Sequence, residues 1–377
     1  MRNMTKEGGS LMTRSCDVGS MPFVGDSNKF VEGASRFSLY PADESCEFFE
    51  KKVLEGLLDK IRVGIDVPNY PQFRDMNEMF LSMMNGVERI KGGYVETKIP
   101  SVKTDKSSIP EVMVIEKHSQ RIQERKGAAF EVRICVTGPY TLSSFFPYKR
   151  EDIFIRLGNV ISQIVENSIF NNKHGRVTLV SVDEPVFGLQ DDSLIDFGSE
   201  GRENLRRAWE SIFHKVKSKN VQTMIHLHST TNPLFWDIQS LDVIESHVDD
   251  SLIQMKKTGE LLESRDKFLK ASVAVNDFDA LIKKGIVADS REKLTESDVN
   301  ERIADVWTDI KHGRINPEIF LESVDAMNSR LVKVVERFGI ERVLYAGPEC
   351  GLKGYPTYET AIECLRRVSS AIENFEK

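Results

Sequence analysis

The chain has 377 residues, of which 40% are hydrophobic, and its formal net charge at pH 7 is −7. This composition can form a sizeable core, and the length suits two ordinary domains or one α/β barrel with extensions. The mildly acidic charge balance argues against a broad nucleic-acid-binding surface. No apolar run approaches the ~20 residues that a membrane helix needs. We therefore expect a globular enzyme that binds neither nucleic acid nor membranes.

The cysteines and the N-terminal residues indicate the expected compartment. The five cysteines are an odd number, are widely spaced and form no CxxC motif, which argues against a disulfide framework or a zinc ribbon. The first fifteen residues include Arg2, Lys6 and Arg14 but lack the apolar stretch of a secretory signal. We expect a reduced, cytoplasmic protein in which residues 1–15 form an N-terminal extension.

Short segments rich in β-branched residues alternate with longer amphipathic segments. Residues 44–62, for example, place Phe49, Val53, Leu57 and Ile61 on one helical face. Short segments of the first kind are typical of buried parallel strands. The expected strands are residues 16–20, 63–67, 131–136, 177–182, 221–228, 241–246, 285–289 and 342–346. Eight strands alternating with helices predict an α/β fold, a single (β/α)8 TIM barrel over residues 16–377.

Residues 88–126 fit this alternation poorly. The segment is charged, contains Gly92, Gly93, Pro100 and Pro110, and is longer than a usual connection between a strand and a helix. We expect an insertion after the second strand that includes a small hairpin and covers the mouth of the barrel. A solvated insertion without a role explains the composition equally well.

Polar residues follow most of the expected strands. In barrels of this type the reacting groups lie just past the carboxyl ends of the strands. The residues found there are Ser20, Asn69, Gln72, Gly138, Pro139, Asp183, Glu184, Pro185, His226, His228, Glu245, His247, Asp289, Glu349, Cys350 and Gly351. This concentration of imidazole, thiol and carboxylate groups is the main indication of a functional site.

The histidines and one cysteine in this set are candidate metal ligands. His226 and His228 are two residues apart on a strand, so both side chains point to the same face. His247 lies near the end of the next strand, and Cys350 follows the last. Imidazole nitrogen and thiolate bind zinc well, and a catalytic zinc needs about three protein ligands. A lone histidine at a strand end is more often a hydrogen-bonded polar residue, so both interpretations stay open here.

The tripeptide Asp183-Glu184-Pro185 follows an apolar strand. A carboxylate in this position could accept a hydrogen bond from the ammonium group of a substrate. Asp183 could equally be the N-cap of a helix, because Asp is favoured there and Pro suits the first turn.

Six motifs resemble those of the C-terminal catalytic barrel of cobalamin-independent methionine synthase, within the group that includes uroporphyrinogen decarboxylase. GSMP at 19–22 resembles the family's GSFP, and GIDVPNYPQF at 64–73 resembles GLDVLVHGEF. VTGPYTL at 136–142 resembles TGPVT, and VDEPVF at 182–187 resembles IDEPAL. MIHLHST at 224–230 resembles IHTHMC, and GPECGLKGYPTYETA at 347–361 resembles PDCGLKTR. The motifs occur in the family's order and extend over nearly the whole chain.

This resemblance implies a zinc-dependent methyltransferase that methylates a zinc-bound thiol, most simply homocysteine to give methionine. The family's zinc ligands are the His and Cys of an HxC motif, a Glu after the next strand, and the Cys of CGLK. Cys350 matches the last of these. The HxC motif corresponds either to His226-Leu227-His228 or to His228-Ser229-Thr230, and the position of the Glu is occupied by His247. The ligand set that the resemblance implies is His226, His228, His247 and Cys350.

The resemblance also implies how the acceptor is bound. Asp183 would hold the ammonium group and Ser20 the carboxylate, while Gln72 replaces a family glutamate that helps to hold the amino acid. This replacement weakens the case for homocysteine and leaves another thiol, such as coenzyme M, as an alternative. The chain corresponds to one barrel of the full-length enzymes, so the methyl donor could be a folate or a methyl-corrinoid protein. A metal-free accessory barrel whose zinc site has decayed is the third interpretation.

Overall fold

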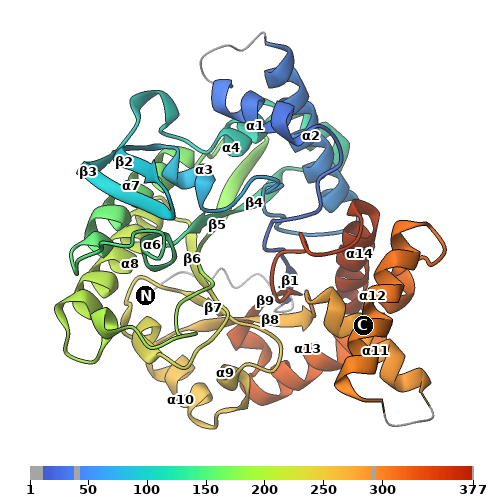
Figure 1. The fold of residues 1–377 in the computed structure, drawn as a ribbon. Coiled ribbons are helices and arrows are strands. Elements are labelled where there is room, and N and C mark those ends of the chain that lie inside the picture. Colours follow the sequence, from blue (N-terminus) through green and yellow to red (C-terminus); the bar gives the residue numbers. More distant parts are fainter. Residues whose placement is uncertain (1–11, 38–42, 291–293, 376–377) are drawn as a thin grey trace.

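A curled sheet of seven parallel strands lies at the centre of the protein (Figure 1). The structure, a computed structural model, describes residues 12–37, 43–290 and 294–375. The strand order is β1-β9-β8-β7-β6-β5-β4, and all neighbouring strands are parallel. The strands are β1 (Arg14–Ser15), β4 (Phe130–Thr137), β5 (Gly175–Glu184), β6 (Gln222–Leu227), β7 (Val243–Glu245), β8 (Phe268–Ala274) and β9 (Val343–Pro348).

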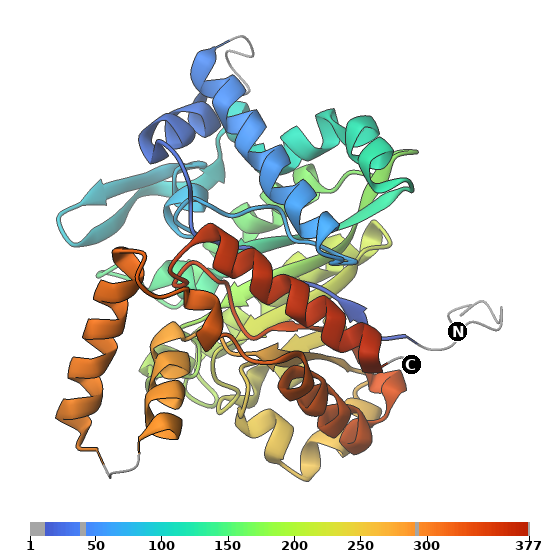
Figure 2. The same cartoon turned by 90° about the vertical axis from the view of Figure 1, so that its right-hand side faces the viewer.

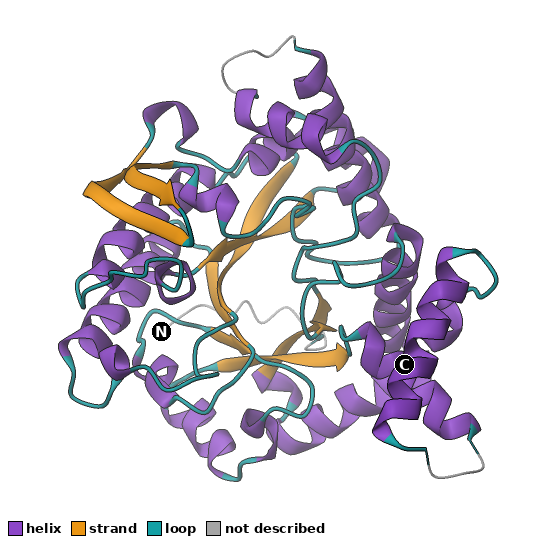
Figure 3. Cartoon of the chain, viewed as in Figure 1, coloured by secondary structure: helices purple, strands orange, loops and turns teal. Residues whose placement is uncertain are grey.

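Helices surround the sheet on its outer side (Figure 3). They are α1 (Ser27–Arg36), α2 (Glu44–Arg62), α3 (Glu78–Leu81), α4 (Pro110–Lys117), α5 (Ser119–Lys126), α6 (Pro139–Ser143), α7 (Ile153–Ser168), α8 (Glu200–Ser218), α9 (Ser251–Gln254), α10 (Lys257–Ser264), α11 (Phe278–Asp289), α12 (Glu296–Lys311), α13 (Val324–Phe338) and α14 (Tyr358–Phe375). The helix expected at 44–62 is α2, which buries Phe49, Val53 and Leu57 completely and is capped by the Asp43 carboxylate. Within the described ranges, none of these helices has the length and apolar character that a membrane span requires.

An irregular segment lies between the two edge strands, β1 and β4. The backbone N–H of Val67 donates to Ser15, and the N–H of Arg133 in β4 donates to Pro68. Isolated parallel bridges join the same segment to both edges. The strand expected at 63–67 is therefore not a regular element, because Pro68 and Pro71 have no N–H to donate to a ladder. The predicted α/β fold is confirmed, with a curled parallel sheet of seven strands, whereas the closed barrel of eight strands is not confirmed.

The prediction of a strand at residues 285–289 is wrong. These residues form the last turns of α11, and the strand is β8, which begins ten residues before that helix. β8 contains Lys270, a residue type that is rarely buried without a partner. Here the Lys270 ammonium donates to the Glu245 carboxylate and to the Pro348 carbonyl. The strand is thus stabilised by partners from other strands, which its own sequence does not indicate.

An antiparallel hairpin lies outside the main sheet, where part of the insertion was expected. It consists of β2 (Met84–Ile90) and β3 (Gly93–Val102), and Gly92 in its turn has φ +91°, a conformation that favours glycine. The N–H of Tyr94 donates to the carbonyl of Phe145 and attaches the hairpin to the loop after α6. The boundaries of the insertion stay a prediction. Residues 1–11 of the expected N-terminal extension lie outside the described residues, while Arg14 and Ser15 already pair with β9.

A buried lysine connects α2 to the segments that carry Ser20 and Gln72. Lys60 is fully buried, and its Nζ lies 2.6 Å from the Asp17 carboxylate. The same ammonium donates to the carbonyl oxygens of Gly19 (3.3 Å) and Asn69 (3.1 Å). Its three donors therefore have three acceptors, which is the condition for burying a charge at tolerable cost. This contact fixes the loops on which two expected substrate residues lie.

Lys60→Met should lower the free energy of unfolding by about 3–5 kcal/mol, because it leaves the Asp17 carboxylate buried without its cation. Urea unfolding followed by circular dichroism measures the change. Lys51→Met is the matched control, since Lys51 on the same helix is 69% exposed and lies 3.8 Å from an exposed partner, Glu55. The control should change stability by less than about 0.5 kcal/mol. A similar small effect for Lys60→Met would contradict the structural role assigned to this contact.

Candidate metal and substrate site

The four expected ligand residues converge at the carboxyl ends of neighbouring strands. His226 lies in β6, His228 follows that strand, and His247 and Cys350 each lie two residues beyond the ends of β7 and β9. One donor atom from each of these residues can be chosen so that all four lie within 4.8 Å of one another. The Cys350 Sγ and the His228 Nε2 are 3.4 Å apart. Strand ends at one rim of a parallel sheet bring these side chains together although they are far apart in the sequence.

The donor atoms fit a metal ion. Both ring nitrogens of His226 and the Nε2 of His247 are buried and make no hydrogen bond, and the His226 Nδ1 lies 3.5 Å from the Glu245 carboxylate. Buried polar atoms are normally hydrogen-bonded, so the Nε2 atoms of these two histidines require an explanation. Zinc–ligand bonds of ~2.0–2.3 Å imply ligand separations of ~3.3–3.7 Å in a tetrahedral site. Small side-chain rotations would bring the four donors to these separations.

Thr230, which ends the second possible register of the HxC motif, is hydrogen-bonded in the loop after β6. The Thr230 hydroxyl donates to the Asp250 carboxylate, and the Thr230 N–H donates to the same carboxylate at 3.2 Å. His226 and His228 both lie in the four-residue cluster. The register stays a prediction, and His228 belongs to both possibilities.

One row of paired residues crosses the interior of the sheet at the level of the site. Asp183 pairs with His226, His226 with Glu245, and Glu245 with Lys270 on four neighbouring strands. Paired residues in parallel strands direct their side chains to the same face. The site therefore has a continuous line of charged and titratable groups. Sequence analysis identified Asp183 and His226 but gave no role to Glu245 and Lys270.

Glu245 is fully buried and is engaged by cations on both sides. Its carboxylate accepts from the Arg133 guanidinium at 2.8 Å and from the Lys270 ammonium, and it lies 3.5 Å from the His226 Nδ1. Burial would raise the pKa of Glu245, but Arg133, Lys270 and His226 outweigh it and hold that pKa well below its usual range. Glu245 is thus a partner of His226 behind the cluster, and His226 can present its Nε2 to a metal ion.

The three histidines differ in their protonation. Burial lowers the pKa of His226, but the Glu245 carboxylate and the Cys350 side chain outweigh it and raise that pKa to about 10. Burial and the neighbouring His226 lower the pKa of His228 to about 3 and that of His247 to about 4. His228 and His247 are therefore neutral, the form that binds metal ions. At His226 a metal ion competes with a proton.

Glu349 organises the other side of the cluster. It is 5% exposed, and its carboxylate accepts from the backbone N–H groups of Val248 (2.8 Å) and Asn276 (2.9 Å). The same carboxylate lies 3.9 Å from the His247 Nδ1. Glu349 therefore connects the loops after β7 and β8 to the end of β9 and lies behind His247. The sequence analysis placed Glu349 near the site without a role.

Asp183 and Glu184 have different roles in the structure. Asp183 lies within β5 and begins no described helix, so the helix-cap interpretation is wrong. Its carboxylate accepts from the Ser181 hydroxyl at 2.6 Å and lies 3.8 Å from the Arg133 guanidinium, and burial raises its pKa. Glu184 instead accepts from the N–H groups of Tyr140 (3.0 Å) and Thr141 (2.6 Å) at the start of α6. The role of Asp183 in binding a substrate stays a prediction.

Ser20 and Gln72 lie side by side and are joined by a parallel bridge. The carbonyl of Ser20 accepts from the N–H of Leu352 at 2.7 Å, and a Cβ on Gly351 would lie 1.8 Å from the Ser20 Oγ. Glycine at 351 therefore allows the loop that carries Cys350 to lie against Ser20. Gln72 is buried, and its amide donates to the Met79 sulfur at 3.5 Å. Gln72 thus offers no charge to a substrate.

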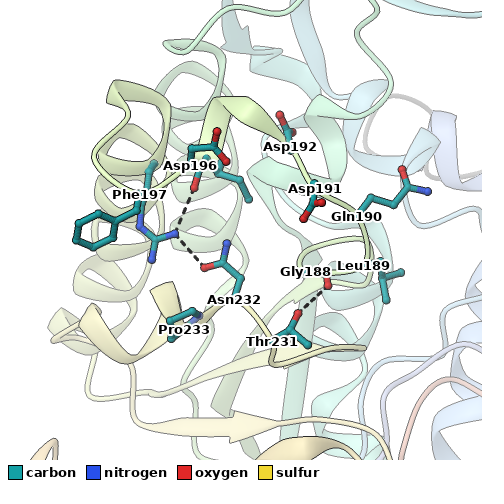
Figure 4. A pocket seen from close by; sticks show the side chains of 12 residues that line it. Gly188, Leu189, Gln190, Asp191, Asp192, Asp196, Phe197, Thr231, Asn232 and Pro233 are labelled. Atoms are coloured by element: carbon teal, nitrogen blue, oxygen red, sulfur yellow. Dashed lines mark hydrogen bonds between the residues drawn. The ribbon is translucent and has the colours of Figure 1, made fainter.

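Two large hollows lie near the ends of the strands. One, of about 680 Å³, is lined by residues 188–192, 195–197 and 231–233 together with Arg202, and the Thr231 hydroxyl donates to the Gly188 carbonyl in its wall (Figure 4). None of the candidate residues lines this hollow. The other, of about 810 Å³, has His247 and Glu349 in its wall and therefore adjoins the metal cluster.

Comparisons with known proteins give similarity in structure but not in sequence. No family model and no characterised protein sequence matches the chain. A B12-independent methionine synthase from Shewanella sp. W3-18-1, solved in complex with selenomethionine, matches with a TM-score of 0.58 at 12% identity, over 97% of this chain and 98% of that one. A protein assigned as a vitamin-B12-independent methionine synthase, from Listeria monocytogenes, matches with a TM-score of 0.55 at 15% identity, over 96% and 98%. The chain therefore shares the fold of the B12-independent methionine synthases over nearly its whole length.

Proposed function

We propose that the protein is a zinc-dependent methyltransferase that methylates a thiol, with homocysteine as acceptor and methionine as product. The observation that carries this proposal is the convergence of His226, His228, His247 and Cys350, with the buried Nε2 atoms of His226 and His247 making no hydrogen bond. The fold and the selenomethionine bound to the Shewanella protein support the choice of reaction. The buried, unpartnered nitrogens speak against a metal-free accessory barrel, because a decayed site would be expected to satisfy them internally.

His226, His228, His247 and Cys350 are the residues that would hold the zinc, and three of them at a time would leave its fourth position for the acceptor thiol. The ion when bound would supply the positive charge that keeps this thiol ionised at neutral pH. Three neutral imidazoles and one thiolate would leave more positive charge on the zinc than the family's ligand set, which has one histidine, two cysteines and a glutamate. Two buried carboxylates offset part of this difference, since Glu245 lies behind His226 and Glu349 behind His247. Such outer carboxylates fix the ring orientation and increase the basicity of a ligating histidine.

The acceptor would be bound by Asp183 and Ser20. Asp183 lies next to His226 in the sheet, so an ammonium group held there places the rest of a small amino acid beside the cluster. Ser20 contacts the loop of Cys350 and would receive the carboxylate. The methyl donor would be the second substrate. The family resemblance implies a folate or a methyl-corrinoid protein in this role.

A second candidate function is methylation or alkylation of another thiol, such as coenzyme M. Two observations favour it. Gln72 gives the acceptor site no second carboxylate, and Asp183 is already approached by Arg133 at 3.8 Å. Both features reduce the attraction for an ammonium group.

The purified protein should contain about one zinc per chain, and Cys350→Ser should weaken zinc binding at least tenfold, because the thiolate is the one anionic donor in the set. Metal analysis and competition with a chelator measure both. Cys46→Ser is the control, since Cys46 is a buried thiol in α2 that contacts the Gly33 carbonyl. It should keep the zinc. Wild-type protein that stays metal-free after incubation with zinc would overturn the proposal.

Asp183→Asn should raise the KM for homocysteine by about ten- to a hundredfold, because a charge-assisted hydrogen bond contributes roughly 1.5–3 kcal/mol. Zinc content should not change, since Asp183 is not a proposed ligand. Steady-state kinetics with homocysteine and with a thiol that has no amino group measure the effect, and the second thiol should be insensitive to the substitution. Equal KM values for both thiols in wild type and variant would favour the second candidate function.

A further inference from the structure

The hollow of about 810 Å³ adjoins the cluster of His226, His228, His247 and Cys350, and it has no role in the proposed binding of the acceptor. It lies at the carboxyl ends of β7, β8 and β9, and its wall includes His247 from the cluster. Trp307 comes from α12, which packs against α11 as a two-helix arm at the side of the barrel (Figure 2). Ser20, Gln72 and Asp183 do not line the hollow. A ligand there would contact the cluster from a side that the acceptor does not occupy.

Two aromatic rings form one wall. The ring centroids of Phe278 and Trp307 are 5.6 Å apart, at an interplanar angle of 56°. The Trp307 indole N–H donates to the Asp279 carboxylate at 2.6 Å, which fixes the orientation of the ring. Phe278 is 3% exposed and also packs against Tyr355, with ring centroids 5.2 Å apart. A fixed aromatic face is a binding surface for an apolar group or a cation.

The charged residues of the wall are all acidic. Asp249, Asp277, Asp279 and Glu349 line the hollow, and among the described residues that line it there is no lysine or arginine. Arg330 lies behind this wall, but its guanidinium is bound to the Glu322 carboxylate and the Val273 carbonyl. The hollow therefore has a negative potential, which attracts cations and repels polyanions. A polyglutamylated folate is a polyanion and is disfavoured here.

We propose that this hollow binds the methyl donor and that the donor is a methyl onium compound, with the methyl group on a positively charged sulfur or nitrogen. The inference rests on the proposed methyl transfer to a thiol and names its second substrate class. Carboxylates together with an aromatic face are the groups that recognise such cations. The position of His247 in the wall places the donor against the site of the acceptor sulfur.

The reaction balances without a further cofactor. The acceptor sulfur forms a bond to the methyl carbon with its own electron pair, while the bond from that carbon to the onium atom breaks. The electron pair of the broken bond stays on the leaving atom, which becomes a neutral thioether or a tertiary amine. The proton of the thiol passes to solvent. For a sulfonium donor the product is a neutral thioether, and loss of the positive charge weakens the hold of the acidic wall on it; a tertiary amine product takes up a proton and keeps its charge.

Binding to zinc-free protein tests the inference independently of catalysis. Isothermal titration compares S-adenosylmethionine with its neutral thioether S-adenosylhomocysteine, and choline with its neutral isostere 3,3-dimethylbutan-1-ol. In at least one pair the cation should bind about tenfold or more tightly than the neutral partner. The pair that shows the difference identifies the sulfonium or the ammonium class.

Two substitutions locate the binding. Trp307→Leu removes an aromatic face, and Asp249→Asn removes one charge at an exposed position whose φ of +64° asparagine also adopts. Each should weaken cation binding about five- to tenfold. Asp191→Asn is the matched control, because Asp191 is an exposed acid in the other hollow. It should leave binding unchanged.

The outcomes separate this inference from the proposed function. If neither cation binds better than its neutral partner, the inference is wrong whatever the activity. If 5-methyltetrahydrofolate or methylcobalamin methylates the thiol and the onium compounds do not bind, the inference is wrong and the proposed function holds. Onium binding that depends on Trp307 and Asp249, without methyl transfer to any thiol, supports the assignment of the hollow and contradicts the proposed function.

Discussion

The buried carboxylate of Glu245 connects the strands that carry the candidate site. It lies in β7, accepts hydrogen bonds from Arg133 in β4 and Lys270 in β8, and is 3.5 Å from the His226 Nδ1 in β6. Burying these charges is costly, and the group is stable only because each charge has a partner. The interaction crosses the interior of the curled sheet and joins strands that are not neighbours. Removing any one of its charges would leave the others buried and uncompensated.

This group also couples the metal cluster to the acceptor side of the site. Arg133 lies 2.8 Å from Glu245 and 3.8 Å from Asp183, so one guanidinium is shared between the carboxylate behind His226 and the carboxylate proposed to bind an ammonium group. A cationic acceptor would therefore compete with Arg133 for Asp183. The affinity for an amino-acid thiol then depends on how strongly Glu245 retains the guanidinium, which sequence motifs alone do not indicate.

The sequence predicts an element well when the residues that stabilise it are its own neighbours in the chain, and poorly when they come from other strands. The helix at α2 follows from its own apolar spacing and its Asp43 cap, and the strands at β4 and β5 follow from apolar runs. The convergence of His228 and Cys350 follows from their places after strands, because parallel strands end at one rim. By contrast, β8 was missed because buried Lys270 depends on Glu245, a residue of another strand. The regular strand expected at 63–67 fails because prolines follow it.

The same distinction explains why the hollow beside His247 was not predicted. Its wall depends on α11 and α12. Residues 285–289 of α11 resemble a strand because Ile286, Val287 and Ala288 are consecutive apolar residues, with no polar residue among them to indicate a helical face. Once they are helical, the arm places Trp307 against Phe278, and the site has two sides. Asp183 in β5 and Ser20 after β1 lie outside the wall of the acidic, aromatic hollow, which is formed at the ends of β7, β8 and β9 and includes His247 of the cluster. In-line transfer places the acceptor sulfur and the leaving atom on opposite sides of the methyl carbon, so the donor has to reach the sulfur from a direction that the rest of the acceptor leaves open.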